Sequence, residues 1–301
     1  MTTPLSAEVV RAVESVLAEE GVRHGPLREG PAWLNRNLSD GQNVFVKVSE
    51  PVQGESIPEP AGSRAAAEIR GALWAAEHGV RTVSPLVSDV RTVEVDQDGP
   101  RDVTVWGFHQ EVSPPSMVDQ ILGLMNSIDA VSEVPSRDGC SVFDVRFFEA
   151  RVMSRLDGCV DDAANMIREK TAATAAEVAE RTSDEPYQWI HGDLHVRNLM
   201  WTVSGLPAIV DWESNTVGPL SWELAQVTGS VLNHFPRHCT RDKQRFLGRV
   251  ENTIAEKFPH VNIDTVQACT DMRTLSWLSH VKTTAPGTPL EKFLLERAAT
   301  I

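Results

Sequence analysis

The 301-residue sequence contains no long apolar segment and no basic leader. A membrane-spanning helix needs about 20 predominantly apolar residues in succession, and no such run occurs in this chain. The first 20 residues contain four acids, whereas a secretory signal peptide would have a basic region followed by an apolar core there. We therefore expect a cytoplasmic protein without a membrane partner.

Cysteine is scarce, and no two cysteines form a CxxC pair. The four lie far apart, at Cys140, Cys159, Cys239 and Cys269. This spacing predicts neither a disulfide nor a structural zinc site, so we interpret the cysteines as buried apolar residues. His234 and His238 precede Cys239, but Pro236 would break the helical face that could bring them together. The sequence therefore predicts no metal cluster in this segment.

Basic residues are outnumbered, with 28 Lys and Arg against 42 Asp and Glu, which gives a formal net charge of -14. Nucleic acids and anionic membranes attract basic surfaces and repel acidic ones. The composition therefore argues against a nucleic-acid partner. The negative charge serves solubility or, alternatively, an acidic cleft that binds a cationic substrate.

The pattern of apolar residues changes along the chain. In the first third, short extended runs at 34–38, 43–48, 86–95 and 103–112 accompany amphipathic helices at 6–22 and 64–78. Later segments predict helices at 117–126, 142–156, 161–180, 222–233, 242–257, 264–281 and 291–299, interrupted by a hairpin at 199–211. We therefore expect an α+β fold of two lobes, 1–112 and 113–301, and we find no internal repeat.

The chemistry is concentrated in the segments 191–199 and 209–213, which read HGDLHVRNL and IVDWE. Phosphoryl transfer from ATP requires a carboxylate that orients the acceptor hydroxyl and oxygen ligands for metal ions that neutralise the phosphates. An Asp, an Asn five positions later and an Asp after the next hairpin can fill these roles. We interpret Asp193 as the base, and Asn198 and Asp211 as ligands of Mg²⁺.

These motifs resemble the aminoglycoside phosphotransferase and choline kinase family, relatives of protein kinases that phosphorylate small molecules. The resemblance implies a protein-kinase-like fold with an N-terminal antiparallel sheet, one key helix and a mostly helical C-terminal lobe. It implies ATP and Mg²⁺ as cofactors and loop-supporting roles for His191 and His195. Glu223 stands where the family usually has an Asp that braces the catalytic loop, and helix capping is the alternative role for Glu223.

The resemblance also implies a lysine on the third strand that holds the α and β phosphates, and Lys47 lies in the matching run. The helix that follows should supply its acidic partner. Glu68 is our first candidate for this partner, and Glu77, near the predicted helix end, is the second.

Two further nucleotide contacts rest on weaker patterns. No GxGxxG motif is present, but Gly30 and Asn35 lie where the family has a degenerate phosphate-covering loop. An ordinary turn glycine is the alternative for Gly30. By order along the chain, the hinge that contacts adenine falls at Gln110 to Val112.

The acceptor is expected to be a small hydroxylated molecule, with an antibiotic as the leading candidate. Acids in the C-terminal helices are matched by lysines and arginines, which favours a weakly charged acceptor over a polycation. Trp212, next to Asp211, is a candidate for lining its pocket. The alternatives are a metabolic kinase of a sugar, amino alcohol or homoserine, and a non-catalytic nucleotide-binding regulator. The protein is expected to be a monomer or a homodimer.

Overall fold

The structure is a computed structural model that describes residues 7–22, 28–29, 33–37, 43–48, 64–94, 100–108, 112–234 and 240–301. The chain divides into two compact units. One comprises Met1–Gly123 with Arg197–Asn215, and the other comprises Leu124–Val196 with Thr216–Ile301. The division falls inside helix α3 (Met117–Ser132). The expected lobe boundary at residue 112 stays a prediction.

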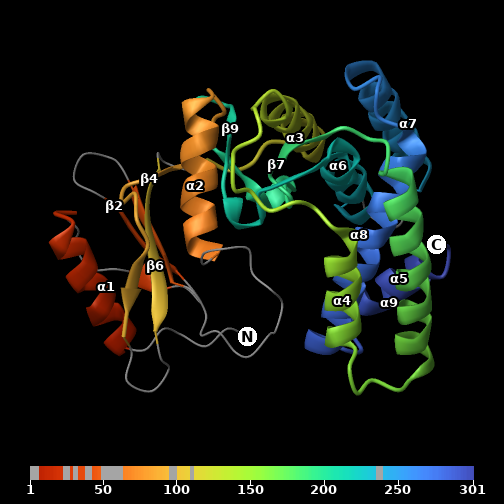
Figure 1. Cartoon of the computed structure of the whole chain (residues 1–301), viewed down its shortest axis with the longest axis horizontal. Coiled ribbons are helices and arrows are strands. Elements are labelled where there is room, and N and C mark those ends of the chain that lie inside the picture. The colour runs from red at the N-terminus through yellow and green to blue at the C-terminus, as the bar shows by residue number, and fades with distance from the viewer. Residues whose placement is uncertain are drawn as a thin grey trace. The chain divides into compact units, whose positions relative to one another are not determined.

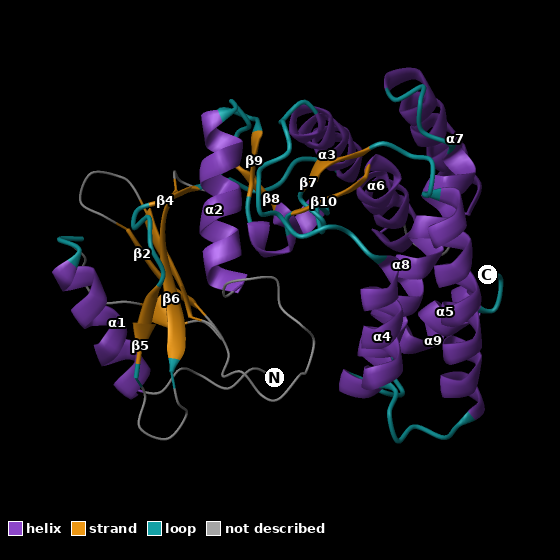
Figure 2. Cartoon of the chain, viewed as in Figure 1, coloured by secondary structure: helices purple, strands orange, loops and turns teal. Residues whose placement is uncertain are grey.

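The first unit is built on an antiparallel sheet (Figures 1 and 2). Its strand order is β1 (Arg28–Glu29), β2 (Trp33–Asn37), β3 (Asn43–Val48), β6 (Arg101–Phe108) and β4 (Ser84–Pro85). Strand β5 (Arg91–Val93) also pairs with β6. The central pair, β3 with β6, aligns Lys47 with Thr104, so the lysine lies near the middle of the sheet.

Alternation along β3 sends its side chains to the two faces of the sheet. Val44, Val46 and Val48 are buried against the apolar stripe of α1 (Ala7–Glu19). Lys47 points to the other face, where its ammonium reaches Glu68 of α2 (Arg64–Glu77). The sheet therefore has α1 on one face and α2 on the other (Figure 1).

A hairpin distant in sequence joins this unit. It consists of β8 (Leu199–Trp201) and β9 (Pro207–Ile209), and Ile209 forms a parallel bridge with Thr82, which follows α2. The 3-10 turn η2 (Trp212–Ser214) comes next and packs on α2. There the Trp212 indole N–H donates to the Thr82 hydroxyl at 2.8 Å. These contacts fix the segment around Asp211 to the helix that carries Glu68.

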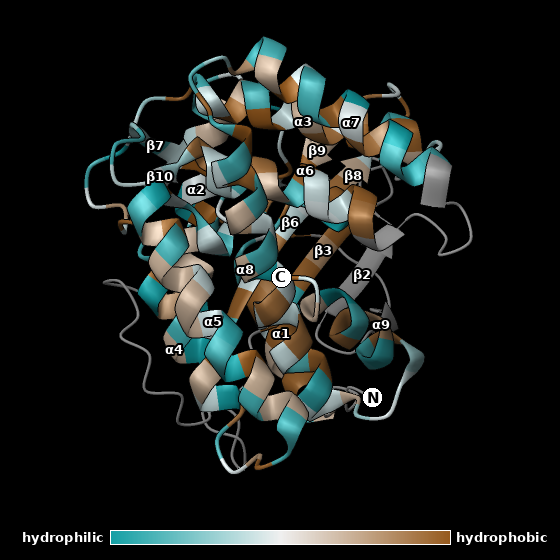
Figure 3. Cartoon of the chain, turned by 90° about the vertical axis from the view of Figure 1, so that its right-hand side faces the viewer, coloured by the Kyte–Doolittle hydropathy of each residue, from teal (hydrophilic) through white to brown (hydrophobic). Residues whose placement is uncertain are grey.

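The second unit is mostly helical. Its helices are α4 (Val145–Arg155), α5 (Asp162–Arg181), α6 (Leu220–His234), α7 (Thr240–Lys257), α8 (Ile263–Thr284) and α9 (Pro289–Ala298). Helix α8 packs against the other five, and the helices carry alternating hydrophilic and hydrophobic bands (Figure 3). Strands β7 (Tyr187–Ile190) and β10 (Thr216–Pro219) pair antiparallel and flank the 3-10 turn η1 (Val196–Asn198) and the hairpin in sequence.

The α+β class is confirmed, with an antiparallel sheet in the first part of the chain and helices in most of the remainder. The strands β7 and β10 were not expected from the sequence. Each has four residues, and β10 contains Gly218 and Pro219, which are disfavoured in isolated strands. The predicted run at 86–95 is reduced to β5 and a bend after β4. In the described part of the chain, no helix is long and apolar enough to cross a membrane.

Candidate active site

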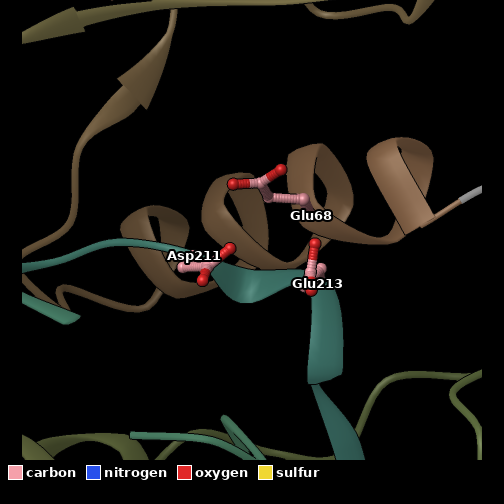
Figure 4. A group of neighbouring side chains, drawn as sticks. All are labelled: Glu68, Asp211 and Glu213. Carbon is pink, nitrogen blue, oxygen red and sulfur yellow. The ribbon is translucent and has the colours of Figure 1, made fainter. Parts of the chain in front are cut away.

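One ammonium group in the first unit is held by three carboxylates (Figure 4 shows the acids). Lys47 Nζ lies 3.1 Å from Glu68 Oε2, 2.7 Å from Asp211 Oδ1 and 3.1 Å from Glu213 Oε2. We call these four residues the lysine–carboxylate cluster. The carboxyl groups outnumber the ammonium, so the fully ionised cluster carries two excess negative charges.

Each member is placed by a different local structure. Glu68 lies in the second turn of α2 and is 4 % exposed, and the segment that carries Asp211 and Glu213 runs beside this helix (Figure 4). Asp211 has φ 67° and ψ 54°, in the left-handed region that costs a non-glycine residue about 1–2 kcal/mol. The packing of η2 on α2 maintains this conformation, which brings the carboxylate to Lys47.

The electrostatics of the cluster have two opposing causes. Burial disfavours the charged form of Lys47, but the three carboxylates outweigh it, so its pKa lies above the ordinary value. Burial raises the pKa of Glu68 to about 7; the charge of Lys47 opposes this rise, and repulsion from Asp211 and Glu213 adds to it. Lys47 therefore stays charged, and a further cation nearby would favour the ionised form of Glu68.

The cluster fits a divalent cation. Ligand oxygens of Glu68, Asp211 and Glu213 all lie within 4.8 Å of one another, and carboxylate oxygens are the donors that Mg²⁺ prefers. Asn198 ends η1 at the base of the β8–β9 hairpin, and its carbonyl accepts from the N–H of Val210 at 3.0 Å. The hairpin therefore holds Asn198 beside the strand end that leads into Asp211.

The expected base lies in the second unit, in the loop after β7. Asp193 Oδ1 accepts from Gln226 Nε2 at 2.7 Å and from Arg273 Nη1 at 3.3 Å. The Asp193 N–H donates to Nδ1 of the fully buried His191 at 3.3 Å. His195 Nε2 lies 3.9 Å from Asp193 Oδ2. Both histidines thus adjoin Asp193, and their supporting roles stay predictions.

Glu223 contacts the same loop from the first turn of α6. Gly192 has φ 84°, a conformation that favours glycine, and its N–H donates to Glu223 Oε2 at 3.2 Å. Burial raises the pKa of Glu223 to about 7, although Arg273 opposes the shift. The longer acid therefore makes the contact that a loop-bracing role requires.

Several expected residues are placed elsewhere or cannot be placed. Gly30, Gln110 and the side chain of Asn35 lie outside the described residues. Val112 is described, and its N–H donates to the carbonyl of Trp201 at 2.9 Å, so a contact with adenine would have to use another group. Glu77 is exposed at the end of α2.

Trp212 does not line a pocket. Its side chain is fully buried, and its N–H is bonded to Thr82, so the expectation of an acceptor contact is wrong for this residue. The cysteines also differ in part from expectation, because Cys140 and Cys159 are half-buried whereas Cys269 is buried. Cys239 lies outside the described residues.

Three residues that belong to the lysine–carboxylate cluster or contact Asp193 were not assigned from the sequence: Glu213, Gln226 and Arg273. Glu213 follows Asp211 by two positions, and the short turn that begins after Asp211 could have signalled that both acids reach the same ammonium group. Gln226 and Arg273 carried no local signal, because they lie on α6 and α8, far in sequence from Asp193.

Comparison with solved structures identifies the fold. Amicoumacin kinase hAmiN aligns with a TM-score of 0.66 and 14% identity, over 98% of this chain and 95% of that chain. Choline kinase LicA from Streptococcus pneumoniae aligns with a TM-score of 0.63 and 12% identity, over 98% of both chains. A thermostable mutant of aminoglycoside phosphotransferase APH(4)-Ia, in a ternary complex with AMP-PNP and hygromycin B, aligns with a TM-score of 0.63 and 13% identity, over 96% of this chain and 97% of that chain. These likenesses confirm the protein-kinase-like fold.

Sequence comparison identifies the family. No curated protein sequence matches the chain. The sequence pattern of the phosphotransferase enzyme family, APH, matches residues 41–247, which include Lys47, Asp193, Asn198 and Asp211. The chain therefore belongs to the APH phosphotransferase enzyme family and is an ATP-dependent small-molecule phosphotransferase.

Proposed function

We propose that the enzyme transfers the γ-phosphoryl group of ATP to a hydroxyl of a weakly charged antibiotic and thereby inactivates it, with Mg²⁺ as the metal. The lysine–carboxylate cluster carries this proposal. Its ammonium can bind phosphate oxygens as a point charge, and its carboxylates can bind the metal that bridges them.

The proposed roles follow from the chemistry of each group. Asp211, with Asn198 and Glu213, would hold Mg²⁺, which neutralises the phosphate oxygens as charge moves to the leaving group. Lys47 would turn to the α and β phosphates, and Glu68 would keep its ammonium in place. As the acceptor oxygen bonds to the γ-phosphorus, the bond to the β–γ bridging oxygen breaks and ADP leaves.

Asp193 would orient the acceptor hydroxyl and take its proton during this transfer. Its side chain is 46% exposed, which allows an acceptor to reach it. The two bonds that hold its Oδ1 limit the rotation of the side chain. The group is therefore both accessible and fixed, as a base must be.

Pairing of acids with bases supports a weakly charged acceptor. In the second unit, Lys282 Nζ lies 2.9 Å from Asp161 Oδ2 and 3.4 Å from Glu291 Oε1. Arg297 Nη2 lies 3.7 Å from Asp271 Oδ1. Carboxylates that already have basic partners offer little to a polycation. A hydroxylated molecule with few charges is therefore the better fit.

The similar structures support two kinds of acceptor. Amicoumacin kinase and the hygromycin complex of APH(4)-Ia favour an antibiotic, whereas choline kinase LicA favours a metabolic amino alcohol. A sugar or homoserine belongs to the same metabolic alternative. These acceptors require the same nucleotide chemistry, so turnover must distinguish them.

The test is ADP release with ATP and Mg²⁺ over a panel of aminoglycosides, nucleoside and peptide antibiotics, sugars, choline and homoserine. Strong turnover of one antibiotic is expected. Asp193→Ala should lower kcat by about 10²–10⁴-fold, the usual contribution of a positioned base, and leave ATP affinity nearly unchanged. The exposed Asp184→Ala is the matched control and should keep full activity.

Other outcomes would redirect the assignment. Turnover of choline, homoserine or a sugar would replace the antibiotic by a metabolic acceptor. ATP binding without turnover of any acceptor would favour the non-catalytic regulator. Wild-type turnover by Asp193→Ala would refute the role of Asp193.

A further inference from the structure

Arg273 is a buried cation whose contacts converge on the catalytic loop. It lies midway along α8, and its side chain is 13% exposed. Burying a guanidinium is costly unless its N–H groups are paired. Its Nε donates to the Trp222 carbonyl at 3.2 Å, and its Nη2 donates to the Gly192 carbonyl at 2.8 Å. Its Nη1 donates to Asp193 Oδ1 at 3.3 Å.

The surroundings of Arg273 keep the guanidinium in this position. It stacks on the Trp222 ring at 4.1 Å from the centroid, and Nη2 lies 3.9 Å from Glu223 Oε1. Gly192 is thereby held at both backbone groups, since its N–H donates to Glu223 and its carbonyl accepts from Arg273. The fork of donors in arginine matches this set of acceptors, whereas the single ammonium of lysine would not.

Gln226 reaches the same carboxylate oxygen from a second helix. It follows Trp222 by about one turn of α6, and its Nε2 donates to Asp193 Oδ1 at 2.7 Å. Oδ1 therefore accepts two hydrogen bonds, one from α6 and one from α8. An oxygen with two donors has little capacity left for a third, so the acceptor proton is better received at Oδ2.

A structural role alone does not explain this arrangement. An arginine that only tied α8 to α6 and the loop would be satisfied by the two carbonyls and Glu223. The contacts of Arg273 and Gln226 with Asp193 go further, because they restrict a side chain that is nearly half exposed. Fixing a reactive group within a few tenths of an ångström is a large contribution to catalysis.

We propose that Arg273 and Gln226 are positioning residues of the phosphoryl transfer, which hold Asp193 Oδ1 so that Oδ2 meets the acceptor hydroxyl. The inference rests on the proposed function of Asp193 as the base. Both residues belong to the second unit, whereas the lysine–carboxylate cluster belongs to the first, so both should affect the acceptor step and not nucleotide binding.

The test compares kcat and the KM for ATP in Arg273→Lys and Gln226→Met, with the acceptor that the wild-type enzyme uses best. Arg273→Lys should lower kcat by about 10²-fold, the typical cost of a misplaced reactive group. Gln226→Met, which removes one donor to the carboxylate, should lower kcat by about tenfold. The KM for ATP should change by less than about twofold in both variants, as expected for residues that act on the chemical step.

Arg168→Lys is the matched control for a merely structural arginine. Arg168 Nη2 donates at 2.6 Å to the carbonyls of Leu156 and Cys159, away from Asp193. This variant should lose thermal stability and keep its kcat. If Arg273→Lys is too unstable to assay, Gln226→Met carries the test, because Gln226 is half-buried and its Nε2 donates one hydrogen bond to the carboxylate of Asp193.

Two results would overturn the positioning role and leave the phosphotransferase assignment intact. One is a wild-type kcat in Gln226→Met. The other is that Arg273→Lys and Arg168→Lys lose kcat equally and in proportion to their loss of stability. Absence of turnover in the wild-type enzyme would overturn the proposed function, and this inference with it. A selective loss of kcat in the two positioning variants would support both.

Discussion

Glu223 illustrates how one buried side chain makes the stability of the folded protein depend on pH. Its exposed fraction is 1%, and burial raises its pKa from 4.5 to about 7. Between these two values, the folded protein retains a proton that the unfolded chain has released. Stability therefore falls as the pH rises through this window, by at most about 1.4 kcal/mol for each unit of pKa shift.

Replacing Glu223 by Gln should flatten this decline. The amide keeps an oxygen for the Gly192 N–H but cannot ionise, so the unfolding free energy should change less with pH than in the wild type. Urea unfolding at about pH 5 and about pH 8 should show a difference between the two proteins of about 1–3 kcal/mol. Glu180→Gln, on the exposed side of α5, is the control. Parallel pH profiles of wild type and Glu223→Gln would contradict the prediction.

Individual residues were predictable where a local motif or strand pattern places them. Lys47 could be assigned because it lies in an alternating strand, and Asp211 because it follows a hairpin. Glu68 was preferred to Glu77, and the structure gives Glu68 the contact with Lys47. Arg273 could not be found, because its role depends on α8 packing beside α6 and no sequence spacing encodes that proximity.

At the scale of elements, the close approach of η2 to α2 assembles the lysine–carboxylate cluster. Gly71 permits this approach, since a Cβ at this position would lie 2.7 Å from Asn215 Nδ2 and 3.0 Å from Trp212 Cβ. Asn215 Nδ2 also donates to the carbonyl of Ala67 at 3.0 Å. The glycine therefore determines how closely Asp211 and its turn can sit against the helix.

Gly71→Ala should separate the two elements. Alanine normally stabilises a helix by up to about 1 kcal/mol relative to glycine, but overpacking here should cost about 1–3 kcal/mol. Gly248→Ala in α7 has no atom within 4 Å of the added Cβ and is the matched control. The melting temperature of Gly71→Ala should be lower than that of this control, and the KM of Gly71→Ala for ATP should rise. Equal stability and an unchanged KM would show that the contact is not needed.

Element types were more predictable than pairings. The helices follow from apolar periodicity and capping residues such as Asp161, Asn262 and Thr288, each of which accepts an N–H at the start of its helix. The β7–β10 pair was missed because its stability comes from contacts between segments that the η1 turn and the β8–β9 hairpin separate in sequence. The packing of η2 on α2 was missed for the same reason, because it also joins segments that are far apart in sequence.

At the scale of the whole molecule, the net charge of -14 is known from the sequence, but its distribution is not. Asp161 and Lys282 are far apart along the chain and form an ion pair only because α8 and the start of α5 meet. In such pairs the basic residue offsets the charge of the acid, which therefore attracts a further cation less strongly. The total charge therefore does not decide the charge of the acceptor.

The dependence of turnover on ionic strength distinguishes a weakly charged acceptor from a polycation. Salt at about 0.3 M screens charges beyond roughly 6 Å, whereas at about 0.05 M the field reaches more than twice as far. For a weakly charged acceptor, KM should change by less than about twofold over this range, because no long-range attraction is lost. The KM for ATP and kcat, measured at the same salt concentrations, control for effects on the enzyme itself. A rise of about tenfold in the acceptor KM alone would instead show that unpaired acids attract a polycation.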